Sequence, residues 1–282
     1  MSLMSKLLTT TIVATLSLNA STSEAEVKDY IINHMVNNSR IKVTSVDMIG
    51  KKELDRPKGW EAFFVNIHAD VKKTPTVTDK ITVPETVFAK DGFAVPTLID
   101  MKTGKDLKSQ IKPKLDPKLY DDKHLFAGDK NATHKILVFS DPQCPFCKEI
   151  VPKIYKAVKE NPKTLALYYY HMPLLRIHPV SDAISRVMMI EQKKGHFDRV
   201  IDMYSLEFNP REVNATKILG KINKKYGLNI TEKDIDAKDI ADELKYDENM
   251  GTKSMVAGTP TIYLDGKWDK SRKAYMKFIK DK

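Results

Sequence analysis

The sequence predicts an α/β fold with a helical insertion, preceded by a small α+β domain. Two short runs rich in branched and aromatic residues, 136–139 and 164–171, have the character of buried strands. From residue 147 to about residue 161, apolar side chains recur at helical spacing and lysines occupy the other face, which predicts a helix between the strands. These elements fill only part of 282 residues, so the length indicates a second unit.

The first 25 residues have the pattern of a cleaved secretory signal peptide. Lys6 supplies a positive charge, residues 7–18 are apolar and threonine-rich, and Ser23 and Ala25 are small residues where a signal peptidase cleaves. The apolar run is shorter than the ~20 residues that a membrane-spanning helix needs. We therefore expect export to an oxidising compartment, most simply the bacterial periplasm.

Residues 26–104 are expected to form the α+β domain, which begins with a helical stretch over residues 27–36. Strand character follows in four runs: residues 41–48, 60–71, 85–88 and 93–101. Residues 105–130 then become rich in lysine, aspartate and proline, which predicts a linker. Asp116 and Pro117 suit the start of one short helix within it.

The only two cysteines, Cys144 and Cys147, lie where the predicted helix begins, after a strand and a turn. Unpaired amides and the helix dipole stabilise a thiolate at Cys144, and the thiolate is the form that attacks a disulfide. Cys147 lies one turn further along, where burial favours the neutral thiol. The spacing predicts Cys144 as the nucleophile and Cys147 as the thiol that resolves a mixed disulfide.

The two residues between the cysteines tune this motif. Pro145 has a backbone angle suited to the first helical turn. Phe146 offers an apolar surface but no charge that could hold a thiolate. The motif therefore predicts only moderate stabilisation of the Cys144 thiolate.

Three other interpretations of the cysteine pair are weaker. A structural disulfide across so short a loop would contribute only about 2 kcal/mol in the chain-entropy model. A structural zinc site needs four protein ligands, so histidines such as His68, His171 or His178 would have to complete it. Two buried cysteines could also be inert apolar residues. Their placement between strand and helix favours redox chemistry, without a metal or other cofactor.

With these motifs, the chain resembles the thioredoxin superfamily over roughly residues 133–282. Pro152 lies five residues after Cys147, where thioredoxin-like proteins carry a helix proline, and Gly258-Thr259-Pro260 precedes the next strand in that family's order. The resemblance implies that Pro260 is a cis-proline facing the cysteine pair, and that the backbone of Thr259 meets a bound substrate strand. The catalytic domain would cover residues 131–282, with the helical insertion at about 175–250.

The whole layout resembles that of the dimeric disulfide isomerases of the DsbC and DsbG family. This resemblance implies a homodimer that holds misfolded, disulfide-bonded exported proteins between its arms, and a membrane redox partner that recycles its active site. Thr259 before Pro260 matches the isomerases, whereas Pro145 is more usual in DsbA-like oxidases. We expect a disulfide isomerase, with a dithiol oxidase and a chaperone (holdase) with little redox role as the alternatives.

The insertion contains two largely apolar helical stretches, residues 181–191 and 197–206, which we interpret mainly as core. Flexible thioethers adapt to varied surfaces, so an alternative is that some of these residues border a substrate groove. That alternative concerns Met188, Met189, Met203 and Phe208. His171 and His178 are expected to be structural or solvated.

Lysine and arginine number 47 against 37 acidic residues, giving a net charge of +10. The lysines are dispersed over helix faces and the linker without interleaved aromatic residues, which indicates solvated surfaces and not a nucleic-acid interface. Residues 129–133 match an extended bacterial glycosylation pattern centred on Asn131. Its use would mark an exposed turn.

Overall fold

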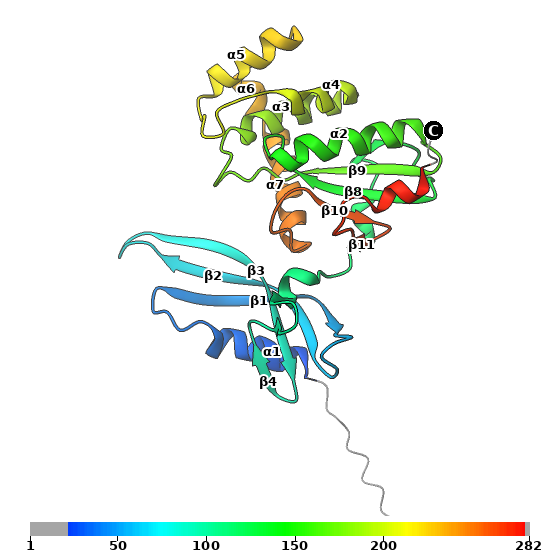
Figure 1. Cartoon of the computed structure of the whole chain (residues 1–282). Coiled ribbons are helices and arrows are strands. Elements are labelled where there is room, and N and C mark those ends of the chain that lie inside the picture. Colours follow the sequence, from blue (N-terminus) through cyan, green and yellow to red (C-terminus); the bar gives the residue numbers. More distant parts are fainter. Residues whose placement is uncertain (1–21, 280–282) are drawn as a thin grey trace, which may run out of the picture.

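The computed structural model describes residues 22–279, which form two main sheets with separate cores, joined by a segment that holds a small two-stranded sheet and short helical turns (Figure 1). Residues 1–21, most of the predicted signal peptide, lie outside the described residues. Within residues 22–279, no helix combines the length and apolar character needed to cross a membrane.

The amino-terminal sheet is antiparallel and has the strand order β1-β2-β3-β4. Its strands are β1 (Ile41–Glu53), β2 (Glu61–Lys72), β3 (Thr78–Lys90) and β4 (Phe93–Val95). Helix α1 (Glu24–Tyr30) and a π-helical turn (Ile31–Met35) pack on one face, because Val27 and Ile31 meet Phe63 and Val65 of β2 there. Ser23 and Glu26 form a capping box that begins α1.

The predicted strands are present with changed limits. The predicted run 85–88 covers only part of β3, in its second half. The first half of β3, residues 78–84, is largely exposed and contains Pro84. Proline donates no ladder hydrogen bond, and an exposed ribbon lacks the alternation that marks a buried strand, so the sequence pattern is weak there. The predicted run 93–101 is interrupted after β4 by Pro96, and strand structure returns only at β5 (Ile99–Asp100).

The connecting segment is more structured than expected. It contains β6 (Lys105–Asp106), paired with β5, and the 3-10 turns η2 (Leu107–Gln110) and η3 (Pro117–Leu119). The Asp116 side chain accepts a hydrogen bond from the Lys118 amide, with Pro117 at the first helical position, which confirms the predicted cap. Residues expected to end the linker instead form β7 (Leu125–Ala127), which joins the second sheet.

The second sheet has the order β11-β10-β8-β9-β7. The predicted strand–helix–strand unit is confirmed: β8 (His134–Ser140) runs parallel to β9 (Leu165–His171), and helix α2 (Pro145–Glu160) connects them. Strand β10 (Thr261–Leu264) pairs antiparallel with β8 and with β11 (Lys267–Trp268). The short 3-10 helix η5 (Ala274–Phe278) follows β11.

The helical insertion lies between β9 and β10 in the chain; in Figure 1, α3 to α6 lie above the sheet and α7 runs down beside it. Its helices are α3 (Ser181–Lys193), α4 (Phe197–Asp202), the 3-10 turn η4 (Met203–Ser205), α5 (Ala215–Tyr226), α6 (Glu232–Ile235) and α7 (Lys238–Lys253). Met188, Met189 and Met203 are at most 3% exposed, and Phe208 packs against the same core as α2. The core interpretation of the insertion is confirmed, and the alternative that these methionines border a groove is wrong.

Candidate active site

Cys144 is the N-cap residue of α2. Its backbone is extended, and its carbonyl accepts the first helical hydrogen bond, from the Lys148 amide at 3.0 Å. Pro145 occupies the first helical position, where a missing N–H costs nothing. Helix formation thus directs free amides toward the Cys144 sulfur.

The segment before β10 approaches this sulfur from the other side. The peptide bond between Thr259 and Pro260 is cis, and both residues are buried. The Cys144 sulfur lies 3.2 Å from the Thr259 carbonyl oxygen, to which it donates when it is protonated. The structure therefore brings Cys144 and Thr259, which are 115 residues apart in the chain, into direct contact.

Hydrogen bonds lower the pKa of Cys144 to about 5. The largest cause is the Cys147 thiol, which donates to the Cys144 sulfur, and burial opposes the shift. The amides of Cys147 and Phe146 add to it, as does the Thr259 side chain. The Thr259 hydroxyl has no partner of full hydrogen-bond geometry among the described residues, so it is available to the Cys144 sulfur. The Cys144 thiolate is more stable than the uncharged motif suggests, because neutral hydrogen-bond donors stabilise its negative charge although no cationic side chain lies in the motif.

Cys147 is fully buried in the first turn of α2. Burial raises its pKa well above the ordinary value, and the neighbouring Cys144 thiolate raises it further. The two sulfurs are not bonded to each other in this structure. The pair therefore favours a thiolate at Cys144, which is 6% exposed, and a neutral thiol at the fully buried Cys147.

Asp141 fixes the turn that presents Cys144. Its fully buried carboxylate accepts hydrogen bonds from the Ser181 hydroxyl at 2.6 Å, the Leu174 amide at 2.8 Å and the Gln143 amide at 2.8 Å, and it contacts His178 Nδ1 at 2.9 Å. These contacts join the turn to the loop after β9 and to the start of α3. From the sequence, Asp141 is recognisable only as a turn former.

Phe146 is 58% exposed beside the nucleophile. The Arg272 guanidinium lies over its ring, 5.2 Å from the centroid, at the distance of a cation–π contact. Arg272 has a backbone φ of +60°, a conformation that non-glycine residues seldom adopt. The contact places a positive charge at the rim of the site, and no local pattern in the sequence indicates it.

The three histidines that could have completed a zinc site have other partners. His68 lies in β2 and contacts Asp47 and Thr82. His178 contacts Asp141, and His171 is buried with its Nε2 3.4 Å from Gln192. Among residues 22–279, no group of three or more His, Cys, Asp or Glu side chains is placed to hold a metal ion.

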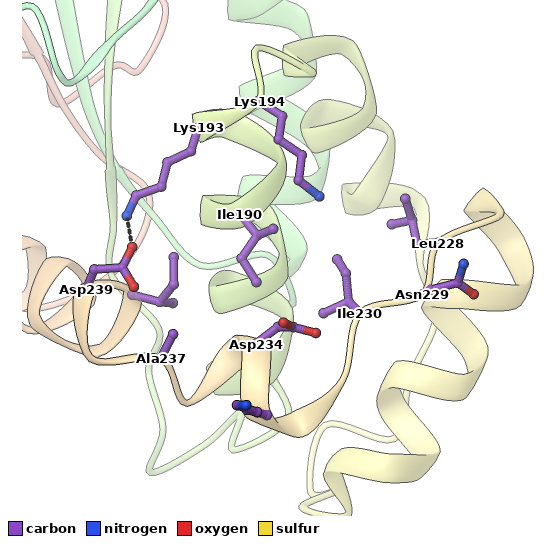
Figure 2. A pocket seen from close by; sticks show the side chains of 11 residues that line it. Ile190, Lys193, Lys194, Leu228, Asn229, Ile230, Asp234, Ala237 and Asp239 are labelled. Carbon is purple, nitrogen blue, oxygen red and sulfur yellow. Dashed lines mark hydrogen bonds and ion pairs between the residues drawn. The ribbon is translucent and has the colours of Figure 1, made fainter.

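A separate cavity of about 630 Å³ lies in the helical insertion (Figure 2). Lys193 and Asp239 form an ion pair of 2.7 Å at its edge. Its lining comes from α3, the connection before α6, α6 itself and the start of α7, and includes Ile190, Lys194, Leu228, Ile230 and Ala237. None of the cysteine-site residues lines it, so it is not part of the redox site.

The comparisons with known proteins concern the second unit. A family model described as Thioredoxin matches residues 121–281. BdbD from Bacillus subtilis (oxidised) is 19% identical, with 59% of this chain and 92% of that chain covered and a TM-score of 0.47. A thioredoxin-like oxidoreductase from Silicibacter pomeroyi DSS-3 is 19% identical, with 52% and 87% covered and a TM-score of 0.43.

Proteus mirabilis ScsC in a compact conformation is 20% identical, with 54% of this chain and 74% of that chain covered and a TM-score of 0.41. No curated protein matches the sequence. The family model alone covers more than half of the chain, and it includes Cys144, Cys147, Thr259 and Pro260. The chain therefore belongs to the thioredoxin family and carries, in its second unit, a cysteine pair of the kind used by thiol–disulfide oxidoreductases.

Proposed function

We propose that this protein is an exported disulfide isomerase of the DsbC and DsbG type, which reshuffles non-native disulfides in exported proteins. The observation that carries the proposal is the state of Cys144, a thiolate with a pKa of about 5 next to Thr259 and Pro260. A low pKa keeps the nucleophile ionised at neutral pH and also makes it a good leaving group. Isomerisation needs both properties, because each attack on a substrate must later be reversed.

In the proposed cycle, the Cys144 thiolate attacks a substrate disulfide, forms a mixed disulfide and releases one substrate thiolate. The substrate backbone pairs with Thr259 as a short added strand. The released thiolate attacks another substrate disulfide, and the thiolate freed there finally displaces Cys144. No net oxidation occurs. Cys147 enters only when a mixed disulfide stalls: it displaces the substrate thiol and leaves the enzyme oxidised.

Location, assembly and recycling form part of the same proposal. The signal peptide predicted at residues 1–25 would direct the chain to the periplasm. The amino-terminal unit would pair two copies into a homodimer, a role supported by its own core and by the exposed Val77, Ile81 and Val83 along its β2–β3 hairpin. A membrane redox partner would keep the cysteine pair reduced.

The deciding assay uses fully oxidised, scrambled ribonuclease in a glutathione buffer. We expect the wild type to restore ribonuclease activity and Cys144→Ser to restore none above background. Cys147→Ser should retain a substantial part of the activity, because an isomerase returns Cys144 as a thiolate without needing the second cysteine. Loss of recovery in the wild type would overturn the isomerase assignment.

A dithiol oxidase is the second candidate, favoured by the same pKa. Stabilising the reduced form makes the Cys144–Cys147 disulfide oxidising. An oxidase would oxidise reduced ribonuclease stoichiometrically, would fail with the scrambled form, and would lose all activity in Cys147→Ser. A holdase would instead prevent aggregation of a cysteine-free client equally well in Cys144→Ser.

A further inference from the structure

Behind Cys147, three buried hydroxyl groups form a connected chain. Ser140 is the last residue of β8, Tyr169 lies in β9, and Tyr204 lies in the 3-10 turn η4. Ser140 Oγ is 2.5 Å from the Tyr204 hydroxyl, which is 2.6 Å from the Tyr169 hydroxyl. All three residues are at most 2% exposed. These are short hydrogen bonds in a buried setting, where such bonds strengthen one another.

We propose that this chain donates a hydrogen bond from Ser140 to the sulfur of Cys147 and so stabilises the Cys147 thiolate when it resolves a mixed disulfide. In this proposal Ser140 is a catalytic residue, because its hydrogen bond would go to the reacting sulfur. Tyr204 and Tyr169 would be positioning residues that orient and polarise the Ser140 hydroxyl. The inference rests on the proposed thiol–disulfide activity and adds residues outside the cysteine motif.

The state of Cys147 sets the direction of these hydrogen bonds. The Ser140 hydroxyl lies within hydrogen-bond reach of the Cys147 sulfur and also of the Tyr169 and Tyr204 hydroxyls. A thiolate can only accept, so when Cys147 ionises, Ser140 donates its proton to the sulfur and accepts from a tyrosine hydroxyl. The donors then run from the tyrosines through Ser140 to the sulfur.

Burial raises the pKa of Tyr169 and of Tyr204 far above the ordinary range. Both phenols stay protonated, so the chain acts as a set of donors and not as a base. The buried carboxylate of Asp141 is already committed to His178, Ser181 and two amides. Water molecules would donate hydrogen bonds to an exposed thiolate. At the buried Cys147 sulfur, the hydroxyl chain would provide these donors instead.

The resolving step explains why such donors matter. In it, the Cys147 sulfur bonds to the Cys144 sulfur, and the bond between Cys144 and the substrate sulfur breaks. The substrate sulfur is reduced and leaves as a thiol, the two cysteines become a disulfide, and the proton lost by Cys147 balances the one gained by the leaving group through water. Negative charge must appear transiently on a sulfur whose pKa burial has raised.

The test separates the two cysteines by using one equivalent of dipyridyl disulfide, which releases a coloured thiopyridone at each displacement. The first release reports attack by Cys144, and the second reports attack by Cys147 on the mixed disulfide. The thiolate fraction of Cys147 falls about tenfold per pH unit, whereas Cys144 stays largely ionised down to about pH 5, so lowering the pH separates the two phases.

We expect Ser140→Ala to slow the second release about tenfold and to leave the rate of the first release within about twofold. The variant removes a hydrogen-bond donor to the Cys147 thiolate, and it removes none from Cys144. Ser140→Thr keeps the hydroxyl and should rescue the rate. Tyr204→Phe should slow the second release about threefold and move its pH profile upward. Tyr155→Phe is the matched control on α2, because its hydroxyl bonds to Asp198, outside the chain, and it should change neither release.

The inference is overturned if Ser140→Ala and Tyr204→Phe both show the same rate and the same pH profile of the second release as the wild type. Equal slowing of both releases would also overturn it, since that would indicate a general disturbance of the site. If Ser140→Ala does not fold, Tyr204→Phe carries the test alone, as it keeps the ring that packs in the core. Absence of the first release in the wild type would instead contradict the proposed function.

Discussion

Cys144 becomes a thiolate through neutral donors. The motif contains no charged residue, and the shift of its pKa to about 5 is caused first by the Cys147 thiol and then by amides at the start of α2. Because these donors belong to the folded helix and to a partner cysteine, the unfolded chain lacks them. The reactivity of Cys144 is thus a property of the folded state, and by linkage it makes stability depend on pH.

The pKa of Cys144 is lower in the folded protein than in the unfolded chain, so its ionisation contributes stability that is full above the unfolded value. That contribution falls as pH is lowered through the window from about 8.5 to about 5 and is gone below it. We expect the difference in melting temperature between the reduced wild type and Cys144→Ser to grow as pH rises through this window. Calorimetry of both proteins under reducing conditions measures it, and a difference independent of pH would contradict the assignment.

Asp141→Asn should destabilise the redox unit by about 2–4 kcal/mol, because the amide cannot accept all the hydrogen bonds that the buried carboxylate receives. Urea unfolding followed by near-ultraviolet circular dichroism measures the loss. Asp129→Asn is the control: Asp129 lies in an exposed turn, where it accepts from the Asn131 amide, and a change within about 0.5 kcal/mol is expected. Equal midpoints for the two variants would show that the Asp141 contacts add nothing.

At the scale of elements, the sequence predicts the strands and helices that show a clear hydrophobic pattern within their own residues. β8, α2 and β9 are long, periodic and buried, and all three were predictable. β7 has three residues and gains its strand conformation only by pairing with β9. The cysteine pair was predictable from spacing along one helix, whereas the Ser140–Tyr204 contact joins residues 64 positions apart and leaves no pattern in the sequence.

The start of α1 bears on how the chain is processed. Cleavage after Ala25 would remove Ser23, whose side chain accepts from the Glu26 amide and completes the capping box. Loss of such a cap costs about 0.5–2 kcal/mol. A protein beginning at Thr22 should therefore be more stable, by that amount, than one beginning at Glu26. Urea midpoints of the two purified forms test this, and identical midpoints would mean that the cap does not stabilise the unit.

At the scale of the whole molecule, Lys112 of the connecting segment and Met255 join the two units. Lys112 packs over Trp268 at 5.2 Å and donates to the carbonyl of Met255, a residue that itself packs against the Leu54 and Phe64 core of the first sheet. Burial lowers the pKa of Lys112 to about 8. The connection between the sheets is therefore made by ordered contacts as well as by the chain.

The proposed homodimer is also a whole-molecule property. Sedimentation equilibrium of the full chain should give twice the mass of one chain at micromolar concentration. Replacing Ile81 and Val83 with lysine on the exposed β2–β3 hairpin should weaken the dimer at least tenfold if the association uses this surface, and leave dipyridyl disulfide kinetics unchanged. A chain that sediments as a monomer at all concentrations would remove dimerisation from the proposal.

The contact between Cys144 and Thr259 has a consequence for synthesis. The ribosome makes the nucleophile 115 residues before the segment that completes its surroundings. A chain that terminates early, or loses its last strands to a protease, keeps both cysteines but has no surface on which to align a client. Under the proposed function, such fragments would keep both thiols but lack the segment that aligns a substrate, so activity would require the full-length chain.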